Sequence, residues 1–178
     1  ARGIKCLGNV RQIGQADIVY TNAFNGWIIP PSIPSNGGGP AVSWFAAYSG
    51  YNNSPISYGT RYFGDGITRG TYVCPSEKVG FGHYNNGLFY YTHYVQNYWS
   101  HGSHRGSATA WVYRLDSSIK MPSECISVMD SLNLSTNSTD SANSIGFRHG
   151  GGDPRAAAKV PVSAIYSKGV ANVLFFDG

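Results

Sequence analysis

The first 24 residues carry an apolar pattern that predicts a helix of several turns. Apolar side chains recur there at spacings of three and four residues, which is the period of one helix face. These residues are Cys6, Val10, Ile13, Ala16, Tyr20 and Phe24. The opposite face carries Lys5, Asn9, Arg11 and Gln12. The pattern therefore predicts an amphipathic helix from Ala1 to Phe24 that packs against the rest of the chain.

Three glycines interrupt this helix, namely Gly3, Gly8 and Gly14. Each costs about 1 kcal/mol relative to alanine in a helix interior. A helix with this content needs packing, or a continuation upstream, to be stable. The chain also begins on Ala1, which is neither Met nor a helix-capping residue. We therefore expect that the N-terminus has been cut and that the original helix ran further back.

The remaining sequence, residues 25–178, is divided into short segments by Gly, Pro, Ser and Asn. We expect a loop around Pro30 to Pro40, a short helix from Ala41 to Tyr48 and a turn-rich stretch to Gly70. Segments rich in β-branched and aromatic residues predict strands. These are Thr71 to Cys74, Leu88 to Val95, Ala110 to Tyr113, Ile126 to Met129 and Val170 to Phe176. Polar or extended loops are expected over Ser131 to Asn143 and Gly150 to Gly169.

Composition limits the architecture to one domain of mixed class. The 178 residues include 23 glycines, 14% aromatic and only 12% charged residues, which excludes a coiled coil or a long helical bundle. A hydrophobic content of 42% is sufficient for a core and argues against intrinsic disorder. One helix followed by several strands predicts an α+β fold, with the helix packed on an antiparallel sheet.

The net positive charge of the chain does not indicate that it binds nucleic acid. The net charge is +4 and the sequence pI is about 9.0. Arg2, Lys5 and Arg11 are the only basic residues that cluster, and no Lys/Arg run is present to follow a phosphate backbone. We therefore expect no nucleic-acid partner.

Catalytic signatures are absent from the sequence. There is no GxSxG, HExxH, P-loop or GxGxxG motif, and Glu77 and Glu124 are the only glutamates. These observations favour a protein that is not an enzyme. A small hydrolase using Asp130, His149 and Asp177 remains as an alternative, and it requires these three side chains in one open cleft.

Histidines and acidic residues give weak metal signals. His101 and His104 lie three residues apart without a nearby Cys or acidic partner, and we interpret them as solvated loop residues. Asp130, Asp153 and Asp177 are candidates for a cation, although calcium takes six to eight oxygen ligands. A buried network of His149 with Asp130 and Asp177, which would tie two strand ends together, is favoured over a metal.

Aromatic residues are dense near the predicted Leu88 to Val95 strand. Alternation along a strand places Tyr90 and Tyr94 on one face and Tyr91 on the other, and Tyr98 and Trp99 follow. Packing in a core or an interface explains such a cluster at least as well as a sugar-binding platform does. A secreted carbohydrate-binding module is nevertheless the second functional hypothesis.

Three cysteines, Cys6, Cys74 and Cys125, are too few and too widely spaced for a zinc motif, and no CxxC pair exists. The odd number fits either one disulfide with a free thiol or three buried thiols. The low charge and the Tyr, Ser, Asn and Gly content favour an extracytoplasmic protein, in which a disulfide is permitted.

Six short segments, in order along the whole chain, resemble prepilin-type, pseudopilin-like proteins with a closing His-x9-Asp-Gly signature. Cys6 to Gly14 resembles the Cys-x-Asn-Asn-Leu-(Arg/Lys)-Gln-Ile-Gly segment that follows the cleavable methylation signal of this family. The others are Tyr72 to Ser76 (Cys-Pro-Ser), Tyr94 to Asn97, Pro122 to Glu124 with Asp130-Ser131, Phe147 to Gly151, and Ala171 to Gly178.

Two positions depart from the family pattern. Twenty-seven residues separate His149 from Asp177, so residues from about 153 to 168 are interpreted as an insertion. The second Asn of the helix motif is Val10 here, or the pattern is shifted by Gly8. Because of this longer spacer, the relative positions that His149 and Asp177 have in the family do not carry over directly to this chain.

The resemblance implies a pilin-like fold and a structural role in a type IV pilus-like or type II secretion pseudopilus-like fibre. A prepilin peptidase would cleave the precursor, and an apolar half-helix upstream of Ala1 would anchor the subunit in the inner membrane. The globular part would lie in the periplasm and assemble with other pilin or pseudopilin subunits through the remaining half-helix, residues 1–24.

The resemblance also selects structural residues and one disulfide. The residues at motif positions are Cys6, Gln12, Cys74, Pro75, Asp130, Arg148, His149, Asp177 and Gly178. Cys6 and Cys74 lie in family motifs whereas Cys125 does not, so a disulfide between Cys6 and Cys74 is implied. Some pseudopilins hold calcium in a C-terminal loop, and Asp130 and Asp177 are the weak candidates for such a site here; no other cofactor is expected.

Overall fold

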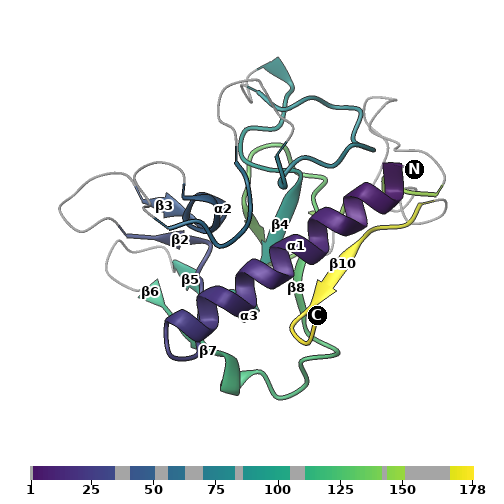
Figure 1. The fold of residues 1–178 in the computed structure, drawn as a ribbon. Helices are drawn as coiled ribbons and strands as arrows, with labels where there is room; N and C mark the ends of the chain where they lie inside the picture. Colours follow the sequence, from purple (N-terminus) through teal and green to yellow (C-terminus); the bar gives the residue numbers. More distant parts are fainter. Residues whose placement is uncertain are drawn as a thin grey trace.

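A single long helix lies across the front of the molecule (Figure 1). The structure is a computed structural model, and it describes residues 2–34, 41–50, 56–62, 70–82, 86–104, 111–141, 144–150 and 169–178. Helix α1 (Arg2–Ala23) agrees with the predicted span to within one residue at each end. Its buried side includes Cys6, Val10, Ile13, Ala16 and Tyr20, as the apolar pattern predicts. Phe24 lies beyond the helix and is 44% exposed, with its ring stacked on Tyr20.

Behind α1 lies the largest sheet, whose strand order is β10-β8-β4-β9. Its central strand β8 (Ile126–Asp130) pairs antiparallel with β10 (Val173–Phe175) and with β4 (Tyr94–Asn97). The edge strand β9 (Ser138–Thr139) runs parallel to β4. Helix α1 contacts both β8 and β10 (Figure 1). The buried stripe of α1 is thus covered by the sheet.

Three two-stranded sheets surround this centre. They pair β1 (Trp27–Ile28) with β7 (Arg114–Leu115), β2 (Ser32–Ile33) with β3 (Val42–Ser43), and β5 (Ser103–His104) with β6 (Trp111–Val112). Short helices α2 (Trp44–Ser49) and α3 (Tyr98–His101) and the 3-10 turn η2 (Asp116–Ser118) complete the described elements. Because these elements are short, tertiary packing must supply most of their stability.

Large aromatic side chains fill the core beneath α1. Trp44, Tyr48, Tyr72 and Tyr94 are fully buried, and the rings of Tyr48 and Tyr72 contact Trp44 edge to face. Their polar atoms are hydrogen-bonded, as burial requires. For example, Trp44 Nε1 donates to the Asn137 carbonyl at 2.8 Å and the Tyr72 hydroxyl donates to Thr60 Oγ1 at 2.7 Å.

The sequence prediction is correct for the fold class and for β8, but several other boundaries are wrong. Residues 71–74 form a turn rather than a strand, because the Cys74 N–H donates to the side chain of His93 instead of a strand partner. The predicted strand from Leu88 becomes regular only at Tyr94. The predicted helix from Ala41 begins at Trp44, because Val42 and Ser43 pair with β2.

Two predicted loops have different outcomes. Strand β9 lies inside the predicted polar loop Ser131 to Asn143 and joins the largest sheet. Most of the loop from Gly150 to Gly169, including the proposed insertion at 153–168, lies outside the described residues, as does Ala110. Among the described residues, no helix combines the length and apolarity needed to cross a membrane.

Gly14 explains why one glycine stands within α1. A Cβ atom built at Gly14 would lie 2.9 Å from Cδ1 of Leu174, the buried residue of β10. The missing side chain therefore lets β10 approach the helix closely. Gly8 differs, because it is exposed and nothing lies within 4 Å of the corresponding position.

This contrast predicts opposite effects for two substitutions. Gly14→Val places methyl groups against Leu174 and should lower the free energy of unfolding by about 1–3 kcal/mol, as overpacking does. Gly8→Ala should raise it by roughly 0.5–1 kcal/mol, because alanine favours the helix and meets no neighbour. Denaturant unfolding of both variants with the disulfide intact measures the two changes. Equal tolerance of both substitutions would contradict the close packing of α1 on β10.

Candidate functional site

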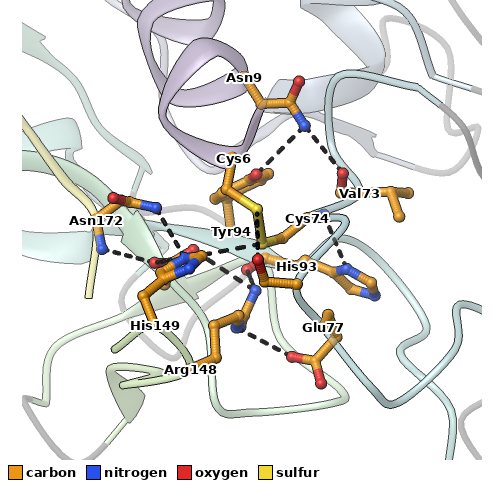
Figure 2. Close-up of a disulfide and its surroundings, with 12 residues drawn as sticks. Cys6, Asn9, Val73, Cys74, Glu77, His93, Tyr94, Arg148, His149 and Asn172 are labelled. Carbon is orange, nitrogen blue, oxygen red and sulfur yellow. Dashed lines mark hydrogen bonds and ion pairs between the residues drawn. A yellow bond between two sulfur atoms is a disulfide. The ribbon is translucent and has the colours of Figure 1, made fainter. Parts of the chain in front are cut away.

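A disulfide joins the second turn of α1 to the loop at residues 70–82 (Figure 2). It connects Cys6 and Cys74, which are 68 residues apart in sequence and fully or almost fully buried. This is the pair that the family resemblance implies. Closing a loop of this length restricts the unfolded chain and contributes about 4 kcal/mol in the chain-entropy account. Cys125 is free and half-buried.

Three hydrogen bonds hold Cys74 beneath the helix. Cys74 N–H donates to Nδ1 of His93 at 3.0 Å, and His93 N–H donates to the Tyr72 carbonyl at 3.0 Å. From α1, Asn9 Nδ2 donates to the Val73 carbonyl at 2.9 Å (Figure 2). The backbone that leads into Cys74 is therefore fixed by the residue before β4 and by α1.

Gln12, a predicted structural residue, joins α1 to two further loops. Its Nε2 donates to the Gly59 carbonyl at 2.6 Å, and its Oε1 accepts from Thr71 Oγ1 at 3.0 Å. Both polar groups of this amide are thus used. In contrast, Pro75 and Gly178, which the resemblance also singles out, are exposed.

Beside the disulfide lies an ion-pair cluster formed by Glu77, Asp130, Arg148 and His149. The side chain of Arg148 is fully buried, and its Nε lies 3.1 Å from Glu77 Oε2 while Nη1 lies 3.5 Å from Asp130 Oδ1. Its guanidinium also donates to the carbonyls of His93 and Ser131. Removing one partner of a buried ion pair typically costs about 3–5 kcal/mol, because a charge is left uncompensated.

His149 connects this cluster to the disulfide. Its Nε2 lies 3.1 Å from Asp130 Oδ2, 2.8 Å from Asn172 Nδ2 and 3.8 Å from Cys74 Sγ. The His149 side chain is only 11% exposed. Asp130 Oδ2 also accepts the Asn172 N–H at 2.6 Å. Figure 2 shows the side chains of His149 and Asn172 beside the disulfide.

The predicted acidic residues do not all meet. Asp130 is fully buried against Arg148 and His149, whereas Asp177 is exposed and makes no ion pair among the described residues. The structure therefore does not bring Asp130 and Asp177 together, either as calcium ligands or as part of the alternative hydrolase site with His149. Asp153 lies outside the described residues.

His101 is not a solvated loop residue, so that prediction is wrong. It ends α3 and is fully buried, with Nδ1 lying 3.0 Å from the Ile29 carbonyl and Nε2 lying 2.8 Å from Ser127 Oγ. Burial lowers the pKa of His101, although Asp17 acts in the opposite direction. The neutral ring fits these contacts, with Nδ1–H donating to the Ile29 carbonyl, while His101 Nε2 and Asp17 Oδ2 are both acceptors within reach of the single Ser127 hydroxyl proton. The side chain of His104 lies outside the described residues.

Asp17 and Tyr48 extend this network. The Tyr48 hydroxyl donates to Asp17 Oδ1 at 2.5 Å, and Ser127 Oγ lies 3.3 Å from Asp17 Oδ2. Burial, followed by the charge of Asp17, raises the pKa of Tyr48 well above its usual value. The tyrosine therefore remains a neutral donor to the carboxylate.

Sequence reasoning missed three polar residues at these sites: Asp17, Glu77 and Asn172. For Asp17 a signal was present, because it lies four residues after Ile13 and three before Tyr20 on the buried face of α1. A carboxylate in an apolar stripe indicates a buried partner. For Glu77 and Asn172 no local signal existed, because their partners lie far away in sequence.

The lowered pKa of His101 predicts a pH-dependent stability. Its folded pKa lies below the unfolded value of about 6.5. The unfolded state therefore binds the proton more readily, and this stabilisation is complete above pH of about 6.5 and is lost as the pH falls toward the folded pKa. Each unit of lowering corresponds to about 1.4 kcal/mol.

His101→Gln should remove this component. Denaturant unfolding between about pH 8 and pH 5 should show a shallower loss of stability for the variant than for the wild type, although its stability at neutral pH should be lower because hydrogen bonds to Ile29 or Ser127 are lost. Parallel pH profiles for the two proteins would contradict a neutral, buried His101.

Comparisons with protein-family models, with curated proteins and with solved structures find no match for this chain. The described site is therefore characterised by its own geometry. It consists of a buried disulfide that fixes α1, a buried ion-pair cluster beside it and a histidine that contacts both.

Proposed function

We propose that this chain is a non-catalytic structural subunit of a type IV pilus-like or type II secretion pseudopilus-like fibre. It would assemble with other subunits through α1, with the globular part in the periplasm. The upstream part of the helix would anchor the precursor in the inner membrane until a prepilin peptidase has processed it. A pilin-like arrangement is the corresponding interpretation of the α+β fold.

A second apolar stripe on α1 carries this proposal. Ile4, Leu7 and Ile18 are 77%, 39% and 51% exposed. At about 100° per residue they fall within about 60° of one another, on an exposed side of the helix that begins beside Gly14 at the edge of the buried face. We call these three residues the outer stripe. A helix with apolar residues on two sides can bury one side in its own domain and the other against a neighbour.

The surroundings of the outer stripe fit a second helix. Gly8 adjoins it, and the space where its side chain would lie is open. Small residues let helix backbones approach one another closely. Arg11 lies between Leu7 and Ile18, and its aliphatic stem can pack while its charged end reaches water. We therefore infer that the occupant is the α1 helix of another subunit.

The firm attachment of α1 also supports a structural role. The disulfide, Asn9 and Gln12 link the helix to the 70–82 loop and to Gly59, while Gly14 lets β10 approach it. A subunit that contacts its neighbours through one helix needs that helix to be fixed to its own globular part. Four separate attachments along a single helix meet this requirement.

The proposal predicts that a charge in the outer stripe prevents assembly. In the full-length chain expressed in its bacterium, Ile18→Asp should reduce the amount recovered in a sheared, high-molecular-weight fibre fraction at least about tenfold, because burying an unpaired carboxylate is costly. Total protein in the cell envelope should remain unchanged.

Ile56→Asp is the matched control, because Ile56 is 53% exposed and lies outside α1. This variant should assemble like the wild type. Circular dichroism of the purified variants verifies that both are folded. Recovery of the wild type only as monomer, or equal assembly of Ile18→Asp, would refute a fibre built through α1.

A surface pocket of about 470 Å³ favours the second hypothesis, a carbohydrate-binding module. Trp99, which is 55% exposed, lines this pocket together with Asn97, Arg114 and Glu124. Sugar rings stack on exposed indole faces while polar neighbours bind their hydroxyl groups. Tyr98 contacts the edge of Trp99, with ring centroids 5.8 Å apart.

Glycan-array binding distinguishes this hypothesis from the first. Under it, Trp99→Ala should abolish a glycan signal that Tyr90→Ala retains, because Tyr90 is 46% exposed but does not line the pocket. Trp99→Phe should keep part of the signal. An array without signal for the wild-type protein would retire the carbohydrate-binding alternative.

A further inference from the structure

Cys6, Cys74 and His149 form a three-residue group whose ligand-type atoms all lie within 4.8 Å of one another. Two cysteines and one histidine are a donor set that suits zinc, which binds thiolate sulfur at about 2.3 Å and imidazole nitrogen at about 2.0–2.1 Å. The group is not visible in the sequence, because its members lie in α1, in the 70–82 loop and next to β10.

The distances fit a tetrahedral ion once the disulfide is open. For the bond lengths above, a sulfur and a nitrogen on the same ion lie about 3.6 Å apart. Cys74 Sγ and His149 Nε2 are already 3.8 Å apart. Two sulfur ligands would lie about 3.7 Å apart, a separation that side-chain rotation can supply after reduction.

A second observation points to a cation at His149. Its Nε2 has one position for a proton or a metal, yet Asp130 Oδ2, Asn172 Nδ2 and Cys74 Sγ all lie within 3.8 Å of it. An asparagine amide can be turned so that its oxygen takes the place of its nitrogen. A carboxylate oxygen, an amide oxygen and a sulfur, which are all electron-pair donors, then surround one point.

We propose that reduction converts this disulfide into a zinc site formed by Cys6, Cys74 and His149. A dithiol reductant transfers two electrons and two protons to the disulfide, giving two thiols and the cyclic disulfide of the reductant. Binding of Zn²⁺ then releases the two thiol protons and forms two Zn–S bonds and one Zn–N bond. The disulfide and the bound metal therefore exclude each other, because both use the same two sulfur atoms.

The site is also supported from outside its ligands. Asp130 accepts the Asn172 N–H and lies beside Nε2, while Arg148 binds the other carboxylate oxygen. Because Asp130 Oδ2 lies 3.1 Å from the ligand nitrogen itself, this carboxylate would lie beside the bound ion and contribute negative charge there. The proposal does not depend on fibre assembly, because it concerns only contacts within one chain.

Titration with Co²⁺ and Zn²⁺ tests the proposal. The Cys125→Ser protein, which keeps only the two site cysteines, is reduced with a dithiol, freed of the reductant and titrated without oxygen. One equivalent of Co²⁺ should produce thiolate-to-cobalt charge-transfer absorption with tetrahedral d–d bands, and Zn²⁺ should displace it. The oxidised protein should show neither spectrum.

His149→Ala in the same background should weaken Zn²⁺ binding at least about tenfold, whereas the exposed Asp177→Asn should leave it unchanged. Thermal unfolding covers the case in which reduction loosens the fold: Zn²⁺ should raise the Tm of the reduced protein and do so far less for His149→Ala. Absence of the cobalt spectrum, equal binding by His149→Ala, or a requirement for Cys125 would overturn the proposal.

Discussion

The buried guanidinium of Arg148 is the interaction on which the other contacts of the site depend. It binds Glu77 from the 70–82 loop and Asp130 from the end of β8, and it donates to the carbonyls of His93 and Ser131, which adjoin the paired ends of β4 and β8. A buried carboxylate is costly unless it is paired with a cation or hydrogen-bonded, and Arg148 supplies the cation for Glu77 and Asp130. One side chain thus holds together the loop that carries Cys74, the central strand and the segment that carries His149.

The parts of the fold that could be predicted are those with a local signal. In helix α1 the buried positions recur every three or four residues. Strand β8 is buried at four consecutive positions and was predicted from its composition and from the turn-forming residues that bound it. Residues 71–74 look like a strand by composition. Their backbone instead forms hydrogen bonds with the His93 side chain and with residues of distant loops. Partners this far away in sequence cannot be predicted from a short stretch of neighbouring residues.

The candidate site follows the same distinction. The pairing of Cys6 with Cys74 came from a family resemblance, since spacing alone left the cysteines open. The prediction for His101 is wrong because the segment from Ser100 to Arg105 is polar and has the composition of a loop. The buried hydrogen-bond partners of the His101 ring are Ile29 and Ser127, which lie far away in sequence. The sequence predicts a network of Asp130, His149 and Asp177. In the structure Asp130 and His149 are in contact, whereas Asp177 is exposed and is not part of their ion-pair cluster.

The position of the disulfide has a mechanical consequence. Cys6 lies near the start of α1, and Cys74 follows β1 and α2, two of the elements that contact this helix. Tension applied between the helix start and the C-terminus passes from Cys6 to Cys74 through a covalent bond. The chain between them, including the rest of α1 and all of α2, is bypassed by the force. The contacts of α1 with β1 and α2 therefore lie outside the path of the force, whereas β8 and β10, which follow Cys74, remain within it.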